Sequence, residues 1–191
     1  MLTATYSLVA IANEQSSMRR TLHKLHQSIK NIWNGLHHTD LAHIEAAFTT
    51  LTEFDSYYRH RKVEQYLIPA IRRATDEADA LLEELEALSM MGVRLLRAIG
   101  DQLQHAVDAG GARIEDVCAS MEQYCHKLLN RFAKEETELF PMASRVFSVE
   151  EWFSIAEKFL SVDGQTHGGR LYSQPAPLLV SRTERHLVTA H

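Results

Sequence analysis

The sequence predicts an all-α fold. Apolar residues recur at three- and four-residue spacing in four long stretches, and no stretch shows the sustained alternation that is typical of a β-strand. The links between these stretches are short, which favours an antiparallel four-helix bundle. A short fifth helix and an irregular C-terminal tail complete the expected architecture. We therefore expect a helical domain over residues 1–161 and a tail over residues 162–191.

The first two helices are predicted over residues 8–36 and from about residue 40 onward. Gly35 marks the end of the first helix, and Thr39 or Asp40 can cap the second. The apolar face of the second helix is expected to continue without a break through the polar residues His60 and Glu64, which would place both in the core. The first stripe comprises Met18, Leu22, Leu25, Ile29, Ile32 and Leu36. The second comprises Leu41, Ile44, Phe48, Leu51, Phe54, Tyr57, His60, Glu64, Leu67 and Ile71.

The third helix is expected to begin near Asp76 and Glu77, whose charges suit the positive end of the helix dipole, and to end at residues 110–111, which are both glycine. The fourth is expected from about Ile114 to Pro141. Their stripes are Leu82, Leu85, Leu88, Leu95, Ile99 and Leu103 for the third, and Val117, Met121, Tyr124, Leu128 and Phe132 for the fourth.

The fifth helix is predicted from a capping box formed by Ser148 and Glu151, and is expected to run through about Leu160. After Val162, glycine and proline interrupt any helical period, so the remainder is expected to lack a core of its own. The segment 178–188 is the part of this tail that could dock or self-associate.

Composition excludes several classes of protein. The chain is 45% hydrophobic and 24% charged, with a formal net charge of -5 and no basic stripe, so nucleic acid is not expected as a partner. No run of about twenty apolar residues could span a membrane, and the N-terminus lacks the basic start of a secretory signal. Cys118 and Cys125 fit neither a redox pair nor a zinc knuckle and are expected to be reduced packing residues. We expect a cytoplasmic protein with no membrane partner.

Two segments of the chain are similar and suggest metal chemistry. Residues 60–69 and 131–141 both place acidic residues shortly before a proline. In the first segment, His60 and Glu64 are four residues apart, so on a helix they share one face and could hold the same ion. The second segment keeps its carboxylates, Glu135 and Glu136, but contains no histidine.

Other histidines in the sequence are candidates for further metal ligands. His26 shares a column with apolar residues of the first helix, whereas His23 lies nearer the solvent side. The predicted metal ligands are therefore His26, His60 and Glu64, with Glu135 or Glu136 from the opposite segment, a nitrogen and oxygen set suited to iron, manganese or zinc. The others are expected to be surface residues, including His105 and His126, for which no acidic partner at helical spacing was identified.

These motifs resemble the hemerythrin-like family, also called the HHE cation-binding domain, over about residues 11–160. In that family the first helix carries a histidine in a pattern similar to residues 25–29, and helices two and four each carry His-x-x-x-Glu before a Leu-Phe-Pro-like ending. His60, Glu64 and residues 67–69 match the second helix. On the fourth helix the matching residues are 134–136 and 139–141.

The chain departs from the family pattern at two histidine positions. The histidine expected on the fourth helix falls on Arg131, or on Phe132 in the register set by Pro141, and the one expected on the third falls on Leu85. A complete hemerythrin-type O2 site is therefore not expected. If Arg131 turns inward, it would pair with Glu64 or Glu135 and leave a buried salt-bridge network in place of the metal.

The resemblance implies a protein that binds non-haem iron or another cation and senses, stores or handles O2 or related oxidants, with a small diatomic molecule or peroxide as the ligand of the metal. One rival is a metal-free helical bundle that acts through its surface or tail, either as a homodimer or as a regulator that binds another protein. A second rival is a mono-iron oxidase or peroxidase. The residues alone assign no reaction, so enzymatic activity is left open.

Overall fold

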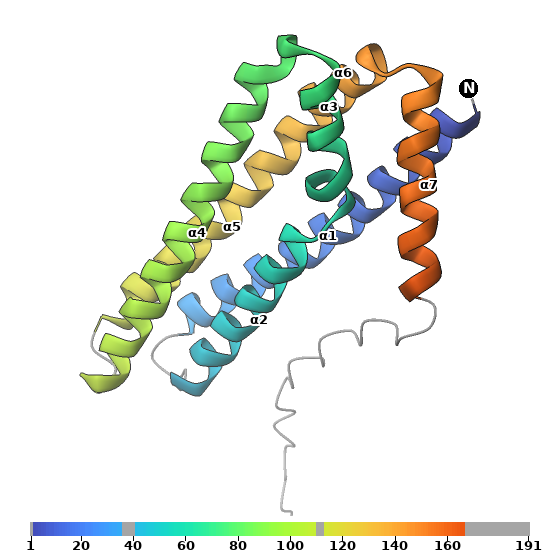
Figure 1. Cartoon of the computed structure of the whole chain (residues 1–191). Coiled ribbons are helices and arrows are strands. Elements are labelled where there is room, and N and C mark those ends of the chain that lie inside the picture. Colours follow the sequence, from blue (N-terminus) through green and yellow to red (C-terminus); the bar gives the residue numbers. More distant parts are fainter. Residues whose placement is uncertain (1, 36–40, 110–112, 167–191) are drawn as a thin grey trace, which may run out of the picture.

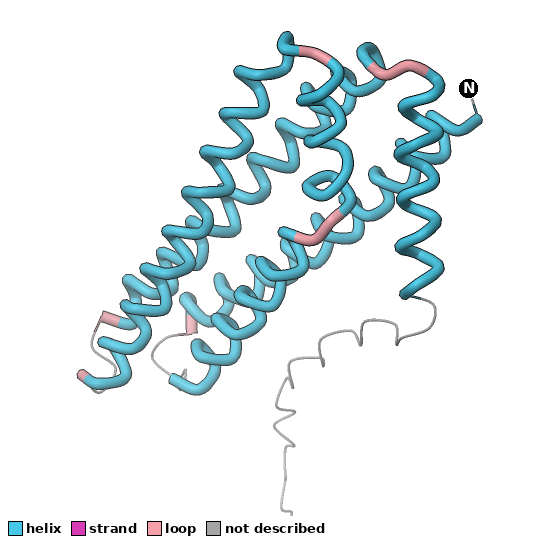
Figure 2. Tube along the Cα trace, viewed as in Figure 1, coloured by secondary structure: helices cyan, strands magenta, loops and turns pink. Residues whose placement is uncertain are grey.

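The structure, a computed structural model, describes residues 2–35, 41–109 and 113–166, and every regular element within these ranges is a helix (Figures 1 and 2). The all-α prediction is confirmed. The expected helix ends at residues 36–40 and 110–111, and the tail beyond residue 166, lie outside the described residues. The elements are α1 (Leu2–Asn34), α2 (Leu41–Arg59), the π-helix η2 (Val63–Leu67), α3 (Ile68–Ala74), the 3-10 helix η3 (Asp76–Ala78), α4 (Asp79–Asp108), α5 (Ile114–Lys134), the π-helix η4 (Glu135–Leu139), α6 (Phe140–Val146) and α7 (Val149–Thr166).

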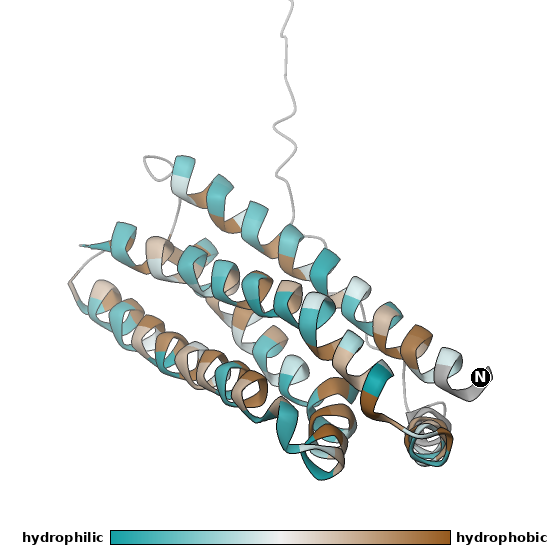
Figure 3. Ribbon diagram, turned by 90° about the horizontal axis from the view of Figure 1, so that it is seen from above, coloured by the Kyte–Doolittle hydropathy of each residue, from teal (hydrophilic) through white to brown (hydrophobic). Residues whose placement is uncertain are grey.

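Four long helices, α1, α2, α4 and α5, pack against one another, with α5 in contact with both α1 and α4 and with α2 touching α1 and α4 (Figure 1). Their apolar faces turn toward one another and their polar faces turn outward (Figure 3). Helix α7 packs against α1 near the N-terminus of the chain. No helix among the described residues is long and apolar enough to cross a membrane.

Buried apolar side chains form two clusters rather than one. The first joins α1, α2, the C-terminal part of α4, and α5. The second joins η2, α3, the start of α4, η4, α6 and α7, and it receives Ile11 from α1. Tyr58 and Phe132 lie at the border of the first cluster, and Val63 and Leu139 belong to the second. The two similar segments of the sequence therefore lie where the clusters meet.

The second predicted helix does not run without a break. Helix α2 ends at Arg59, and a turn at His60 and Arg61 separates it from η2. Tyr57 and His60, both predicted to face the core, are exposed, while Tyr58 and Arg61 are 3% and 1% exposed. The turn does not explain this shift, because Tyr57 and Tyr58 both lie within α2. The predicted stripe passes through Tyr57 and His60, one residue before the buried column that contains Tyr58 and Arg61.

Each similar segment forms a wide π-helical turn directly before its proline. The N–H of Ile68 bonds to the carbonyl of Val63, and the N–H of Phe140 bonds to that of Glu135, so both bonds span five residues. The proline that follows begins a new α-helix, where its missing N–H is tolerated. The predicted fourth helix therefore corresponds to α5 and η4, which end at Leu139 close to the expected stop, and the separate helix α6 was not predicted.

Two other helix ends differ from expectation. Helix α1 begins at Leu2 rather than near residue 8, and its early residues Leu8 and Ala10 pack against the second cluster. The capping box is confirmed, because Ser148 and Glu151 exchange hydrogen bonds of 2.7 and 3.2 Å between side chain and backbone. Helix α7 nevertheless passes the predicted end at Leu160 and continues to Thr166, since one glycine costs a helix only about 1 kcal/mol.

Candidate functional site: a buried arginine and carboxylate network

The two similar segments face each other inside the molecule through four charged side chains. Arg61 and Glu64 come from the turn after α2 and from η2, and Arg131 and Glu135 come from the end of α5 and the start of η4. Arg61 and Arg131 are each 1% exposed and Glu135 is fully buried. Charged side chains are rarely buried so deeply unless they are paired. We call these four residues the Arg–Glu network.

Glu135 is held by both arginines. Arg61 Nη1 donates to Glu135 Oε2 at 2.7 Å, and Arg61 Nη2 donates to Oε1 of the same carboxylate. Arg131 Nε donates to Glu135 Oε1 at 2.9 Å. The Arg61 contact is the bidentate arrangement that matches a planar guanidinium to a carboxylate. The negative charge of Glu135 is therefore fully partnered without a metal ion.

Glu64 completes the network from the opposite segment. Arg131 Nη2 donates to Glu64 Oε1 at 2.6 Å, and Arg61 Nη2 donates to the same oxygen at 3.0 Å. Arg131 Nη1 donates to the main-chain carbonyl of Leu85 on α4 at 2.9 Å. Two guanidinium groups thus balance two carboxylates, and the network joins the turn after α2 and η2 to α4, α5 and η4.

Polar and aromatic neighbours surround Arg61. Its Nη1 lies 3.3 Å from Gln15 Oε1 of α1, and Gln15 Nε2 donates to the carbonyl of Phe132 at 3.0 Å. The guanidinium lies over the rings of Tyr58 and Phe132, with its central carbon 4.4 and 5.2 Å from their centroids. Gln15 is 2% exposed, so α1 also contributes a buried polar side chain to this region.

The pKa values of Arg61 and its neighbour Tyr58 are both raised in the folded protein. Burial by itself lowers the pKa of Arg61, but the negative charges around it, with Glu135 first among them, raise that pKa above its ordinary value. Burial raises the pKa of Tyr58 as well, so its hydroxyl stays protonated. The guanidinium of Arg61 is therefore charged at neutral pH and is held more firmly in that state by Glu135.

A cavity of about 160 Å³ opens beside the network between α2, α4 and α5. Glu64 and Arg131 line it, together with Gly92 of α4 and Lys127 of α5. The side chain of Glu64 is 22% exposed, whereas that of Glu135 is 0% exposed. The cavity thus gives solvent access to one of the two carboxylates and leaves the other sealed.

The structure brings together only part of the predicted ligand set. Glu64 and Glu135 meet as expected, but His60 is exposed, with its Nδ1 2.7 Å from the carbonyl oxygen of Ser56. Glu136 is also exposed and pairs with Arg19 at 3.0 Å. Among the described residues, no three of the predicted ligands have ligand atoms within 4.8 Å of one another.

The residues of the Arg–Glu network do not fit the iron centre that the family resemblance implies. An ion between the two carboxylates would compete with Arg61 and Arg131 for the same oxygens, and like charges would repel at hydrogen-bond distances. The geometry instead matches the alternative in which an inward-facing Arg131 pairs with Glu64 and Glu135.

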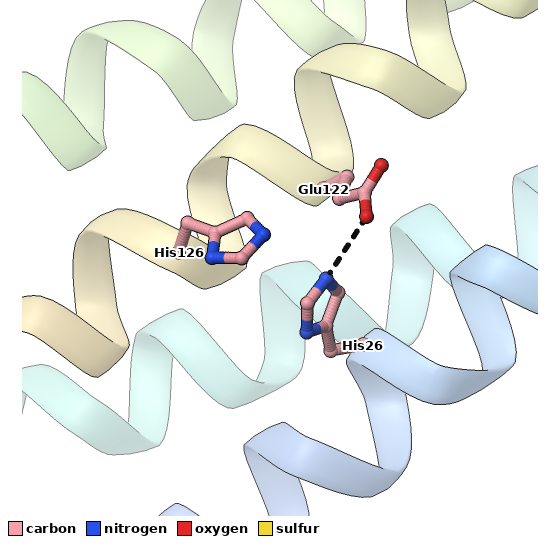
Figure 4. Close-up of side chains that lie close together, drawn as sticks. All are labelled: His26, Glu122 and His126. Atoms are coloured by element: carbon pink, nitrogen blue, oxygen red, sulfur yellow. Dashed lines mark hydrogen bonds and ion pairs between the residues drawn. The ribbon is translucent and has the colours of Figure 1, made fainter.

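His26, the remaining predicted ligand, lies in a different cluster. Its Nε2 is 3.3 Å from Glu122 Oε1 on α5, and its ring meets the ring of His126 edge to face at a centroid distance of 4.6 Å (Figure 4). Burial is the leading cause that lowers the pKa of His26, and it outweighs the opposing effect of the hydrogen bond that the His26 side chain makes to the Glu122 carboxylate. His126 was expected to lack an acidic partner, but Glu122 stands four residues before it.

Two polar residues that are buried at the Arg–Glu network, Gln15 and Arg61, were not predicted from the sequence. Gln15 stands in the apolar column of α1, four residues after Ile11 and three before Met18, and this interruption was a signal that could have been used. Arg61 stands three residues after the buried Tyr58, but a basic residue at such a position is ordinarily expected to be exposed. Comparison with protein-family models, curated proteins and solved structures finds no match to this chain, so the hemerythrin-like resemblance rests on the motifs alone.

Proposed function

We propose that this chain is a hemerythrin-like four-helix bundle in which the Arg–Glu network replaces the metal centre, and that it acts as an interaction or regulatory module that needs no metal ion at this network. The observation that supports this proposal is the burial of Arg61 and Arg131 against Glu64 and Glu135. These carboxylates lie in the two segments that resemble the family's ligand-bearing motifs.

A metal ion at this place would have to displace both arginines from the carboxylates. An ion could reach the carboxylates only if the two guanidinium groups moved away, which would leave buried cations without partners. Breaking a buried ion pair by removal of one member costs about 3–5 kcal/mol, so metal entry carries a penalty of that order. Because Arg61 and Arg131 each contact both carboxylates, moving one arginine disturbs the other.

An exposed apolar seam supports a role in binding another protein. Val149, Phe153 and Leu160 on α7 are 54%, 57% and 58% exposed, and their spacing of four and seven residues places them on one face of the helix. Tyr6 of α1 is 42% exposed and, with Phe153 and Leu160, lines a groove of about 990 Å³. An apolar stripe at this spacing suits contact with a helix of another chain, and we propose a second copy of this protein as the partner.

The metal question is tested by plasma mass spectrometry on untagged protein from iron-supplemented cells. The comparison uses the single variant His126→Ala and a triple variant that adds Glu64→Gln and Glu135→Gln. His126→Ala is present in both so that the separate cluster around His26 does not contribute metal. We expect no stoichiometric iron in either protein. Near-stoichiometric iron in the single variant that is lost in the triple variant would refute the proposal and support iron binding by the two carboxylates.

The partner question is tested by sedimentation velocity over a range of protein concentrations. We expect wild-type protein to dimerise and Phe153→Ser to remain monomeric. Met90→Ser is the matched control, because Met90 is 49% exposed on α4, outside the seam. A wild-type protein that stays monomeric at high concentration would contradict self-association through α7.

A further inference from the structure

A second cluster of metal-binding side chains lies between α1 and α5, which pack against each other. His26 comes from α1, and Glu122 and His126 come from consecutive turns of α5 (Figure 4). One ligand atom from each residue lies within 4.8 Å of the other two. His26 is 8% exposed, while Glu122 is half-buried and His126 is exposed. The cluster therefore extends from the interior to the surface.

We propose that His26, Glu122 and His126 form a binding site for a divalent first-row transition-metal ion, with zinc as the expected occupant, that joins α1 to α5. Two imidazole nitrogens and one carboxylate oxygen form a donor set that zinc accepts, with water as the fourth ligand. None of these residues belongs to the Arg–Glu network, so the proposal is independent of the interior of the bundle.

The geometry requires little rearrangement. In a tetrahedral site with zinc-to-ligand distances of about 2.0–2.1 Å, ligand atoms lie roughly 3.3 Å apart. His26 Nε2 and Glu122 Oε1 already lie 3.3 Å apart. His126 is exposed, and one of its ring nitrogens already lies within 4.8 Å of the ligand atoms of His26 and Glu122, so a change of its side-chain rotamer is the movement that would close the site.

Lys30 is the charged group that competes with the ion. It stands four residues after His26 on α1, and its Nζ lies 3.4 Å from Glu122 Oε1, the same oxygen that His26 approaches. The side chain of Lys30 is 45% exposed, so it can move into solvent when an ion takes its place. Removal of its charge should therefore strengthen metal binding, whereas removal of a ligand should weaken it.

The test is calorimetric titration of the full chain with Zn²⁺, repeated with Co²⁺, whose absorption spectrum reports tetrahedral nitrogen and oxygen ligands. We expect one tight site in the wild type and weaker binding in His126→Ala by about tenfold or more, since loss even of groups that only orient a ligand costs 10–100-fold. Lys30→Gln is expected to bind more tightly than the wild type. At the same zinc concentration, zinc should also raise the melting temperature of the wild type more than that of His126→Ala.

His23→Ala is the matched control, because His23 is an exposed histidine on the same helix as His26 and lies outside the cluster. It should bind zinc as the wild type does. Equal losses in His23→Ala and His126→Ala would show unspecific binding to surface histidines and overturn the proposal. Tight binding that survives His126→Ala would overturn it too. Because His126 is exposed, circular dichroism of the His126→Ala variant should show an unchanged fold.

Discussion

Arg131 Nη2 lies 2.6 Å from Glu64 Oε1, while Nε of the same guanidinium lies 2.9 Å from Glu135 Oε1. One side chain therefore joins the two segments whose similarity suggested a metal site. In a metal centre, an ion would join such carboxylates from different helices. Here a planar cation occupies that bridging position, and its five N–H groups allow it to bind both carboxylates and the carbonyl of Leu85 at once.

The first prediction concerns the stability of the network. Arg61→Met should lower the free energy of unfolding by about 3–5 kcal/mol, because it leaves Glu135 buried with a single partner. The double variant Arg61→Met, Glu135→Met should lose less than the sum of the two single variants, since it removes a charge together with its counter-charge. Urea denaturation of all four proteins measures the coupling.

Arg72→Met is the matched control for this cycle. Arg72 pairs with Glu86 at 3.3 Å on the surface, where the two side chains are 54% and 65% exposed. Its replacement should cost less than about 1 kcal/mol. Strictly additive effects of Arg61→Met and Glu135→Met would contradict the network as a coupled unit.

The second prediction is that histidine can restore metal uptake. Arg131→His places an imidazole four residues before Glu135 and removes a competing cation, so iron or cobalt content should rise above that of the wild type. Adding Arg61→His should raise it further, because Arg61 donates to both carboxylates. Plasma mass spectrometry measures the content in a His126→Ala background.

The control for metal uptake is Arg72→His, which adds a histidine at an exposed position. Circular dichroism establishes that each variant is folded. If folded Arg131→His, with or without Arg61→His, takes up no more metal than Arg72→His, the network does not descend from a metal site.

These residues also show what the sequence could and could not predict. The inward pairing of Arg131 was one of two alternatives drawn from the sequence, because the resemblance to the hemerythrin-like family leads to an expected histidine at Arg131 or Phe132 and the carboxylates of both segments needed partners. The burial of Arg61 was not anticipated, because the predicted stripe passes through Tyr57 and His60, one residue before the buried positions Tyr58 and Arg61. Two neighbouring columns of a helix can fit the same apolar spacing, and tertiary packing decides which of them is buried.

His26 illustrates a second limit. Its place at the edge of an apolar stripe was read correctly, since His26 is 8% exposed and His23 is exposed. Its partners were not, because helical spacing relates residues within one helix and gives no axial alignment between α1 and α5. The contact with Glu122 depends on that alignment.

The third prediction compares two glycines of α4. Replacing a helical glycine with alanine stabilises a helix by about 0.5–1 kcal/mol if the added methyl group fits. At Gly92 the added carbon would lie 3.7 Å from Tyr124, an ordinary contact distance, whereas at Gly100 it would lie 3.3 Å from Phe48. Gly92→Ala should therefore raise the unfolding free energy by about that amount, and Gly100→Ala should raise it less. Equal gains in urea denaturation would show that Phe48 moves aside freely.

The fourth prediction concerns Cys118 and Cys125, which are buried free thiols, as the sequence suggested. Burial raises the pKa of Cys118 from 9.0 to about 11 and that of Cys125 from 9.0 to about 12. Because the thiolate is the reactive form, both should react slowly with iodoacetamide in the native protein and rapidly in urea.

The same shifts fix the direction of an alkaline effect on stability. Below pH 9 both thiols are protonated in the folded and unfolded chains, so their contribution is fully present. As the pH rises from 9 toward 11–12, the unfolded thiols lose protons first, and the free energy of unfolding should fall. Tyr58 and Tyr124, whose pKa values are also raised from 10.0, act in the same direction at higher pH. A Cys118→Ala, Cys125→Ala variant should therefore lose less stability than the wild type between pH 9 and 10, and equal losses would show that the thiols do not carry this effect.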